Sequence, residues 1–484
     1  MPKPQSGWMR IGPDVPPEII ELAFKKMKRL TNLKYLDIKE LSTKNKICID
    51  HLASSKQFLS SLTTFKIHFD SARYIDEHGV LDLILPKKSL LMFITCLKLG
   101  KIGSPGEFSS FQGLANSCPN LTSLFFDFSC PSVAWNKIKK EFEPYQLDRN
   151  YLSTMATFKN LKVLDLTISD LFTFFKDFAL PPSVQRLNLY FSQALSHDIL
   201  LRIDENFTDT EEALSKIFEE NPLFLRFYEV FQPLQELKVL QLYFGQTSDR
   251  ETFKYHSALC NSLLKRTPTL EKLIYIPFSQ IWTLVNPSVP EMIDAYLSQF
   301  LGSCQHLGKT LKDIEIGHEK VKYSKVDFLA LRNKFSKLKA IKITGMIDEA
   351  IGSFLEEVSC LGDSITEINL CSFIENNTKA LLSLLQQVKK FQRKTREMSI
   401  DLRLKFLENK DLEGSKTDFE EAIGELEEVQ KGNLRVRGVS LKIFTGVFSE
   451  EMKEFLKVYG EEFDNFEVVS KNVGFSDKWS ALRD

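Results

Sequence analysis

Large apolar residues recur along this chain at two fixed distances, and the segment Phe158–Asp170 (FKNLKVLDLTISD) shows the pattern most clearly. Its apolar positions are Leu161, Leu164 and Leu166, which gives the frame Leu-x-x-Leu-x-Leu. On a strand, Leu164 and Leu166 point to the same face because they are two residues apart. The residues between and beside them point to the opposite face. The frame therefore predicts a short strand that is apolar on one side only.

Copies of this frame run through most of the chain. The other triplets are Leu33/Leu36/Ile38, Leu62/Phe65/Ile67, Ile94/Leu97/Leu99, Leu121/Leu124/Phe126, Val184/Leu187/Leu189, Leu237/Leu240/Leu242, Leu270/Leu273/Tyr275, Leu311/Ile314/Ile316, Leu338/Ile341/Ile343, Ile365/Ile368/Leu370 and Val436/Val439/Leu441. A weaker copy, Ile400/Leu402/Leu404, keeps only the alternation of a strand. A single unit cannot bury three apolar side chains, but stacked neighbours can. The copies therefore predict an array of repeats in which parallel strands lie side by side.

The segments before the strands have helical spacing and often end near a cysteine or a proline. The examples are Phe111–Ser117, Tyr255–Lys265, Ala295–Cys304 and Ile351–Cys360. The intervals between copies, about 23 to 53 residues, leave room for such a helix in most repeats.

The segment Leu114–Phe126 (LANSCPNLTSLFF) combines helix, Cys-Pro-x-Leu and strand, and it resembles the cysteine-containing, ribonuclease-inhibitor-like branch of the leucine-rich repeat proteins. The resemblance covers roughly residues 33–443. It implies an α/β solenoid, a horseshoe with a parallel concave β-sheet, helices on the convex side and irregular insertions. It says nothing about the ligand.

The frame also suggests how the chain is divided. We predict an N-terminal extension with a capping helix at 1–30, a solenoid of about 12–13 repeats at 31–446, and a C-terminal cap and tail at 447–484. Insertions are expected near 129–155, 192–233 and 405–433. Helices are expected at Pro16–Lys28, Asn136–Glu143 and Asp418–Gln430, and after Ser449.

Composition narrows the compartment and the class of partner. The 484 residues carry 63 Lys and Arg against 64 Asp and Glu, a formal net charge of -1, so nothing global indicates nucleic acid or a membrane surface. No apolar run reaches the roughly 18 residues of a membrane span. The first ten residues lack the apolar core of a secretory signal. Together with eight cysteines and no CxxC pair, this predicts a reducing, cytoplasmic location, with nuclear and organellar locations left open.

Motifs for catalysis, cofactors or metals are not recognisable. The sequence has no Gly-rich phosphate loop, HExxH, GxSxG or zinc spacing, so we predict no enzyme, no cofactor and no metal site. The cysteines at helix ends are expected to be small buried apolar residues rather than nucleophiles. His68 is expected on the outward face as a surface polar group rather than a catalytic base.

Two charged segments are candidates for docking. Residues 204–220 hold seven acidic residues and one lysine, and they fall in the longest insertion. Residues 389–396 hold five cations, which could bind an acidic partner or RNA. For each segment the alternative is a helix whose charged side is simply solvated.

The outward face of the strands is the better candidate site. On the early strands its residues include Tyr35, Asp37, Lys66 and His68, and Asp165 follows in the middle. The mixed signs of charge argue against nucleic acid. Tyr and Arg are enriched where protein interfaces bind most strongly. We therefore predict a partner-binding site on the concave face at Phe125, Arg186, Asn188, Tyr190, Gln241, Tyr243 and Ile274.

These observations favour a non-enzymatic scaffold that binds a protein with its concave face and insertions, and a structural subunit of a larger complex is one form that such a scaffold takes. The alternative is the substrate-recognition subunit of an F-box type ubiquitin ligase, because Val15–Ile20 (VPPEII) looks like the opening of an F-box. The first repeat begins near Leu33, which leaves little room for the remaining F-box helices. The oligomeric state and the identity of the partner stay open.

Overall fold

The structure is a computed structural model of the whole chain, which divides into two compact units, Met1–Thr269 and Leu270–Asp484. The description below covers residues 5–10, 15–27, 33–41, 46–69, 84–101, 113–128, 133–136, 141–144, 155–168, 180–191, 200–201, 204–206, 208, 210–231, 234–244, 252–276, 307–317, 335–347, 366–375, 386, 399–407, 421, 424–425, 438–444 and 466–469. Each unit is described by itself.

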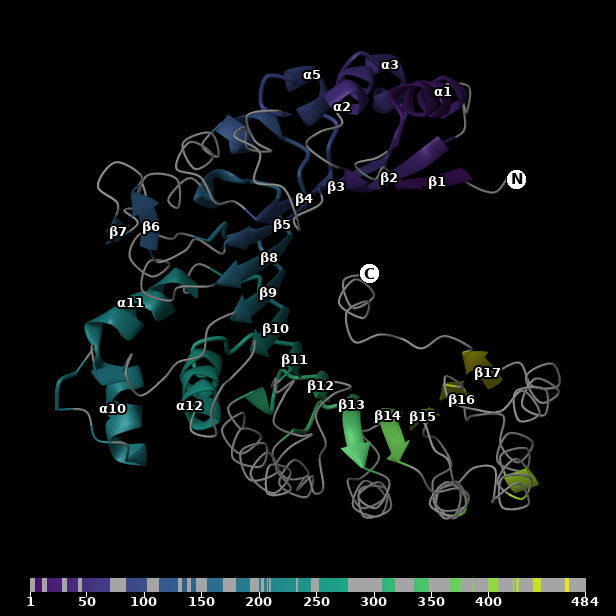
Figure 1. Cartoon of the computed structure of the whole chain (residues 1–484). Coiled ribbons are helices and arrows are strands. Elements are labelled where there is room, and N and C mark those ends of the chain that lie inside the picture. Colours follow the sequence, from purple (N-terminus) through teal and green to yellow (C-terminus); the bar gives the residue numbers. More distant parts are fainter. Residues whose placement is uncertain are drawn as a thin grey trace. The chain divides into compact units, whose positions relative to one another are not determined.

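The first unit is built on parallel strands that follow one another in sequence order (Figure 1). They are β1 (Gln5–Arg10), β2 (Leu33–Leu41), β3 (Thr64–Phe69), β4 (Cys96–Lys101), β5 (Ser123–Phe128), β8 (Val163–Ile168), β9 (Arg186–Phe191) and β10 (Val239–Phe244). Each pairs in parallel with the next. A parallel neighbour requires the chain to cross back between strands, and the segments between these strands do so.

The second unit repeats the arrangement. Its strands are β11 (Lys272–Ile276), β12 (Asp313–Gly317), β13 (Ala340–Ile347), β14 (Glu367–Glu375), β15 (Ser399–Leu407), β16 (Gly438–Phe444) and β17 (Phe466–Val469). All neighbouring pairs are parallel. The prediction of an α/β repeat fold with parallel, sequence-ordered strands is confirmed. The frame did not predict β1 or β17.

Helices cover one side of the sheet in the first unit. Figure 1 shows α1 (Pro17–Met27), α2 (Lys46–Ala53), α3 (Lys56–Ser60) and α5 (Lys88–Leu91) together on one side of β1 to β4. The helices predicted at Pro16–Lys28 and Tyr255–Lys265 are confirmed as α1 and as α12 (Thr252–Leu264), which follows β10 in the chain, and residues 113–117 are also helical. A short 3₁₀ turn, η1, spans Met155–Thr157.

Several predicted helices cannot be compared with the structure. Ala295–Cys304, Ile351–Cys360 and the helix after Ser449 lie outside the described residues. Of Asp418–Gln430, only residues 421, 424 and 425 are described, and these are helical.

The core is formed by the frame residues. Leu161, Leu164 and Leu166 are all 0% exposed, and so are the corresponding Val184, Leu187 and Leu189 of the neighbouring repeat. Burying one leucine side chain contributes about 1.5–3 kcal/mol relative to leaving it in water. Since each strand supplies two or three such residues to a continuous core, the stability of the array accumulates from repeat to repeat.

Hydroxyl and amide side chains next to the first apolar frame position join successive repeats. Thr63 Oγ1 donates to the Lys34 carbonyl (2.9 Å), Thr122 Oγ1 to the Thr95 carbonyl (3.0 Å) and Ser183 Oγ to the Leu161 carbonyl (2.8 Å). Similarly, the Asn120 and Asn160 side-chain amides donate to the Met92 and Pro119 carbonyls at 2.7 and 2.8 Å. These bonds tie each repeat to the one before it, and the Lys34 and Thr95 carbonyls also accept backbone amides of the following repeat.

The insertion near 129–155 forms a hairpin rather than the predicted helix. Strands β6 (Val133–Asn136) and β7 (Glu141–Pro144) pair antiparallel, with Trp135 opposite Phe142. The prediction of a helix at Asn136–Glu143 is therefore wrong. Val133, Trp135 and Phe142 belong to the β-branched and aromatic residues that suit strands, and paired aromatics on neighbouring strands stabilise a hairpin.

The insertion near 192–233 forms two helices, α10 (Glu211–Glu220) and α11 (Pro222–Phe231). Thr210 begins α10, because its Oγ1 accepts a hydrogen bond from the Ala213 amide (3.2 Å). α10 contacts both α11 and α12. Phe218 and Phe224 meet edge to face across the two insertion helices, with ring centroids 4.7 Å apart. The Arg266 guanidinium lies 3.8 Å from the centre of the Tyr228 ring, and burial raises the pKa of Tyr228.

Candidate functional site

The strands have a second face opposite the buried frame residues, here called the open face. In the first unit, strand register aligns its residues in rows across the strands. One row contains His68, Lys98, Phe125, Asp165, Asn188 and Gln241, and the next contains Tyr190 opposite Tyr243. Since neighbouring strands are only about 4.8 Å apart, side chains in one row contact each other.

A polar cluster occupies the open face of β2 and β3. Asp37 is only 6% exposed; its Oδ1 lies 3.2 Å from His68 Nε2, and its Oδ2 accepts a hydrogen bond from the Tyr35 hydroxyl at 3.2 Å. The Lys66 ammonium lies 5.3 Å from the centre of the Tyr35 ring. His68 is therefore on the outward face as predicted, but it is held beside a carboxylate rather than being an isolated surface group.

The centre of the open face is a chain of hydrogen bonds across β8, β9 and β10. Arg186 Nε donates to Asn188 Oδ1 at 3.2 Å, and Asn188 Nδ2 donates to Asp165 Oδ1. A terminal nitrogen of Arg186 donates to Gln241 Oε1 at 3.5 Å. Asn188 is 3% exposed, whereas Arg186 is exposed. The buried amide thus fixes the position of an exposed cation.

An aromatic pair lies on the open face of β9 and β10, next to these hydrogen-bonded residues. The Tyr190 and Tyr243 rings have centroids 5.3 Å apart and planes tilted by 46°. Tyr190 is half-buried, and Tyr243 is 8% exposed. Phe125 on β5 is half-buried and stands opposite Asp165 on β8. Six of the predicted site residues, Phe125, Arg186, Asn188, Tyr190, Gln241 and Tyr243, therefore lie on the open face of the first unit.

Ile274, the remaining predicted residue, belongs to the second unit. It is on the open face of β11, opposite Glu315 of β12, and it is buried. Next to it, Lys342 Nζ lies 2.6 Å from Glu315 Oε1 on the neighbouring strand. On the second unit's open face, this cation and this carboxylate neutralise each other.

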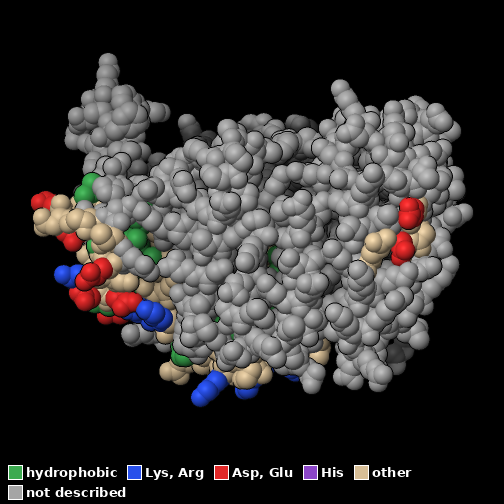
Figure 2. All heavy atoms as spheres, turned by 90° about the horizontal axis from the view of Figure 1, so that it is seen from below, with side chains coloured by type: hydrophobic (Ala, Val, Ile, Leu, Met, Phe, Trp, Pro, Cys, Tyr) green, Lys and Arg blue, Asp and Glu red, His purple; other side chains and the backbone are tan. Residues whose placement is uncertain are grey.

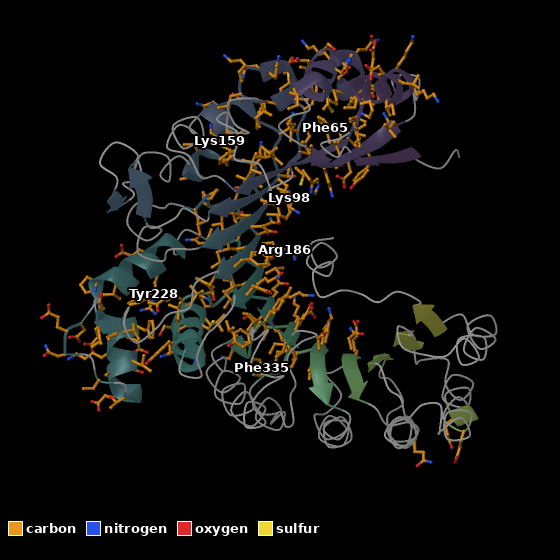
Figure 3. All side chains as sticks on the ribbon, viewed as in Figure 1. Phe65, Lys98, Lys159, Arg186, Tyr228 and Phe335 are labelled. Atoms are coloured by element: carbon orange, nitrogen blue, oxygen red, sulfur yellow. The ribbon has the colours of Figure 1, made fainter. Side chains whose placement is uncertain are left out.

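Figure 3 shows the side-chain arrangement of the first unit: Lys98 and Arg186 lie at the strands, while Lys159 lies on the side away from them. Sequence reasoning placed Asp165 on the outward face but did not include it in the site. The signal that would have found it is the strand register, which sets Asp165 opposite Asn188.

Of the two charged segments, only the acidic one can be described. On α10, Glu212, Glu219 and Glu220 are exposed, and Lys265 Nζ lies 2.5 Å from Glu219 Oε1. Figure 2 shows acidic side chains gathered at the left of the view together with basic ones. The acidic surface is therefore partly neutralised by lysines. The basic run at 389–396 lies outside the described residues.

Among the residues that the structure describes, no three His, Cys, Asp or Glu side chains gather as metal ligands would. Cys48, Cys96 and Cys118 are buried, and burial raises the pKa of each thiol to about 12. They are therefore protonated and unreactive at neutral pH. Among the described helices, none has the length and apolar character needed to span a membrane.

A scan against known protein families and a search of curated proteins both find no match. Among solved structures, a chain in the crystal structure of the Rad7 and Elc1 complex in yeast is similar at a TM-score of 0.39 and 13% identity. The similarity covers 94% of this chain and 93% of that chain. At this level it transfers neither a partner nor an activity, and the repeat fold rests on the strand order and burial described above.

Proposed function

We propose that this chain is a non-enzymatic scaffold that binds a protein partner through the open face of its first unit. The observation that carries the proposal is the ordered centre of that face. Asn188 is buried and bonded on both sides, and it orients an exposed arginine on the same face of β9 as Tyr190, which pairs with Tyr243. Preformed contacts of these residue types lower the entropy that a partner's binding must overcome.

The size of the face explains why the insertions belong to the proposal. Seven steps between strands at about 4.8 Å, and strands about 20 Å long, give roughly 670 Å². A standard interface buries about 800 Å² on each partner. The helices α10 and α11, with exposed Glu212, Glu220 and Leu225, are the neighbouring surface that would supply the remainder.

Cross-linking mass spectrometry of the native complex tests this proposal. A lysine-reactive linker should join the partner to Lys98, on the open face, in preference to Lys159, which lies on the other side (Figure 3). Partner links concentrated at Lys159 would contradict it. Tyr190→Ala combined with Tyr243→Ala should weaken binding of the same partner, while unchanged binding would move the site to the insertions.

A second candidate function is substrate recognition in an F-box type ubiquitin ligase. It is favoured by α1, which buries Ile20 and Phe24 but leaves Ile19 and Leu22 56% and 52% exposed, as a helix with a missing partner would. Against it, β1 precedes α1 and pairs with β2, so the helix lies between two strands of the array. Co-purification of the chain with a Skp1-like adaptor would support this function. Failure of the purified chain to bind the adaptor would rule it out.

Two further proposals concern the class of repeat and the cellular compartment. We propose that the repeats belong to the ribonuclease-inhibitor-like branch, which the helix at 113–117 followed by buried Cys118 and strand β5 supports. We also propose a reducing compartment, with the cytoplasm first, because Cys48, Cys96 and Cys118 are buried thiols that form no disulfide.

A further inference from the structure

Arg186 is an exposed cation whose contacts are made with neutral groups. Its Nε donates to the amide oxygen of Asn188 at 3.2 Å, and a terminal nitrogen donates to the amide oxygen of Gln241 at 3.5 Å. Within the described residues it pairs with no carboxylate. A guanidinium carries five N–H donors, so most of them still face solvent.

The orientation of this guanidinium is fixed from below. Asn188 is 3% exposed, and its amide nitrogen donates to Asp165, so its oxygen is the atom left to face Arg186. The residues opposite Arg186 on the two adjacent strands are Val163 and Val239, which offer no charge. The arginine is therefore oriented by hydrogen bonds without being neutralised by them.

Two other charged groups on the open faces have partners within the chain. Asp37 of the first unit contacts both His68 and the Tyr35 hydroxyl. Lys342 of the second unit has Glu315 within 2.6 Å. Unlike Asp37 and Lys342, Arg186 is an oriented donor group without an ionic partner among the described residues. Its ionic partner therefore has to come from outside them. Its planar fork suits two oxygens of one carboxylate.

We propose that Arg186 anchors an Asp or Glu side chain of the protein partner, while the nearby Tyr190–Tyr243 pair receives an apolar side chain. Arg186 and Tyr190 share the open face of β9 four residues apart, so the two contacts are about 13 Å from each other. The inference rests on the proposed function, because it specifies the chemistry of a partner at that face. It commits to a carboxylate carried by protein.

A display library of random 12-residue peptides, selected on the full-length chain, supplies the probe. The enriched peptides should share an acidic residue and an aromatic or large aliphatic residue. For the best of them made synthetically, Arg186→Gln should weaken the dissociation constant about 30-fold or more, as loss of one member of a desolvated charge pair does. Arg186→Lys keeps the charge but loses the planar guanidinium. Its dissociation constant should lie between those of the unaltered protein and Arg186→Gln.

Lys159→Gln is the matched control, because it removes the same charge from an exposed side chain on the other side of the unit (Figure 3). It should leave the dissociation constant unchanged. Thermal unfolding should show that Arg186→Gln is folded, as expected for an exposed residue. Replacing the acidic residue of the peptide by its amide should reproduce the loss, with no further loss in the Arg186→Gln protein.

Three outcomes separate the inference from the function beneath it. If Tyr190→Ala abolishes peptide binding while Arg186→Gln does not change it, the open face binds but the carboxylate anchor is wrong. If binding at Arg186 requires a phosphorylated peptide, the anchor accepts a phosphate and the carboxylate assignment is overturned. If no selected peptide responds to any open-face variant, both the inference and the proposed function fall.

Discussion

Tyr190 and Tyr243 stand side by side on the parallel strands β9 and β10, with ring centroids 5.3 Å apart and planes tilted by 46°. Aromatic pairs at this distance contribute about 0.5–1.5 kcal/mol beyond their area burial. We therefore predict that a double-mutant cycle of Tyr190→Ala and Tyr243→Ala gives a coupling energy of that size in the free energy of unfolding. Urea denaturation of the two single variants and the double variant measures it.

The control is a second double-mutant cycle that combines Tyr190→Ala with Tyr35→Ala. Tyr35 lies on β2, which is separated from β9 by several strands. Its coupling with Tyr190 should be zero within error, because residues without shared contacts act additively. A coupling near zero between Tyr190 and Tyr243 would mean that the two rings do not support each other.

Leu164 tests the core of the array. It is 0% exposed at the centre of the frame, so Leu164→Ala should lower the free energy of unfolding by about 2–5 kcal/mol. Leu164→Met keeps the volume and should cost less than about 1.5 kcal/mol. The exposed neighbour Lys162 supplies the comparison, since Lys162→Ala should change stability by no more than about 0.5 kcal/mol. Equal costs for the two leucine variants would mean that volume at this site does not matter.

The strands could be predicted from sequence because one physical requirement dominates them. Side chains on a strand alternate between its two faces, so Leu164 and Leu166 are buried together. A shift of the strand register by one residue would expose both. The structure buries them, and it pairs the strands in the order in which the frames occur. The strand register places six of the predicted site residues on the open face of the first unit, and their role in binding a partner stays a prediction.

Features that depend on backbone pairing or on a neighbour could not be predicted. Strand β1 lacks the Leu-x-x-Leu-x-Leu frame, and it joins the sheet through its parallel pairing with β2. The antiparallel β6–β7 pair depends on Trp135 meeting Phe142, which no single segment reveals. Similarly, the burial of Asn188 follows from Asp165 on the next strand. The Thr63 and Thr122 bonds to preceding repeats have a sequence signal, a hydroxyl residue after the first apolar position, that becomes clear only once the repeats are stacked.

Three cysteines offer a test of the folded state by pH and reactivity. Burial raises the pKa of the Cys48, Cys96 and Cys118 thiols to about 12, whereas an unfolded cysteine titrates near about 8.5. At pH 8 the folded thiols are thus protonated, and only the unfolded chain supplies thiolate. Iodoacetamide should leave all three unmodified in the native protein and alkylate them in urea, as measured by peptide mass spectrometry. Rapid labelling of Cys96 in the native protein would contradict its burial on β4.

Arg266 and Lys265 are adjacent residues with contacts of different kinds, and they allow a matched comparison. The half-buried Arg266 guanidinium lies 3.8 Å from the centre of the Tyr228 ring, which is 1% exposed, and it also donates to the Ser262 carbonyl at 2.9 Å. Desolvated cation–π contacts contribute about 2 kcal/mol, and the arginine stem adds packing. We predict that Arg266→Ala lowers the free energy of unfolding by about that amount and loosens α11 from the rest of the first unit.

Lys265 pairs with Glu219 at 2.5 Å, but both side chains are about half exposed, at 52% and 42%. Exposed ion pairs contribute about 0–1 kcal/mol, because water and salt screen the charges. Lys265→Ala should therefore cost less than Arg266→Ala, and its cost should shrink in about 1 M salt, where the Debye length is near 3 Å. Hydrogen exchange of α11 distinguishes the two variants, since only Arg266→Ala should speed it. If Lys265→Ala destabilised the protein more, the exposed ion pair rather than the buried ring would hold the insertion in place.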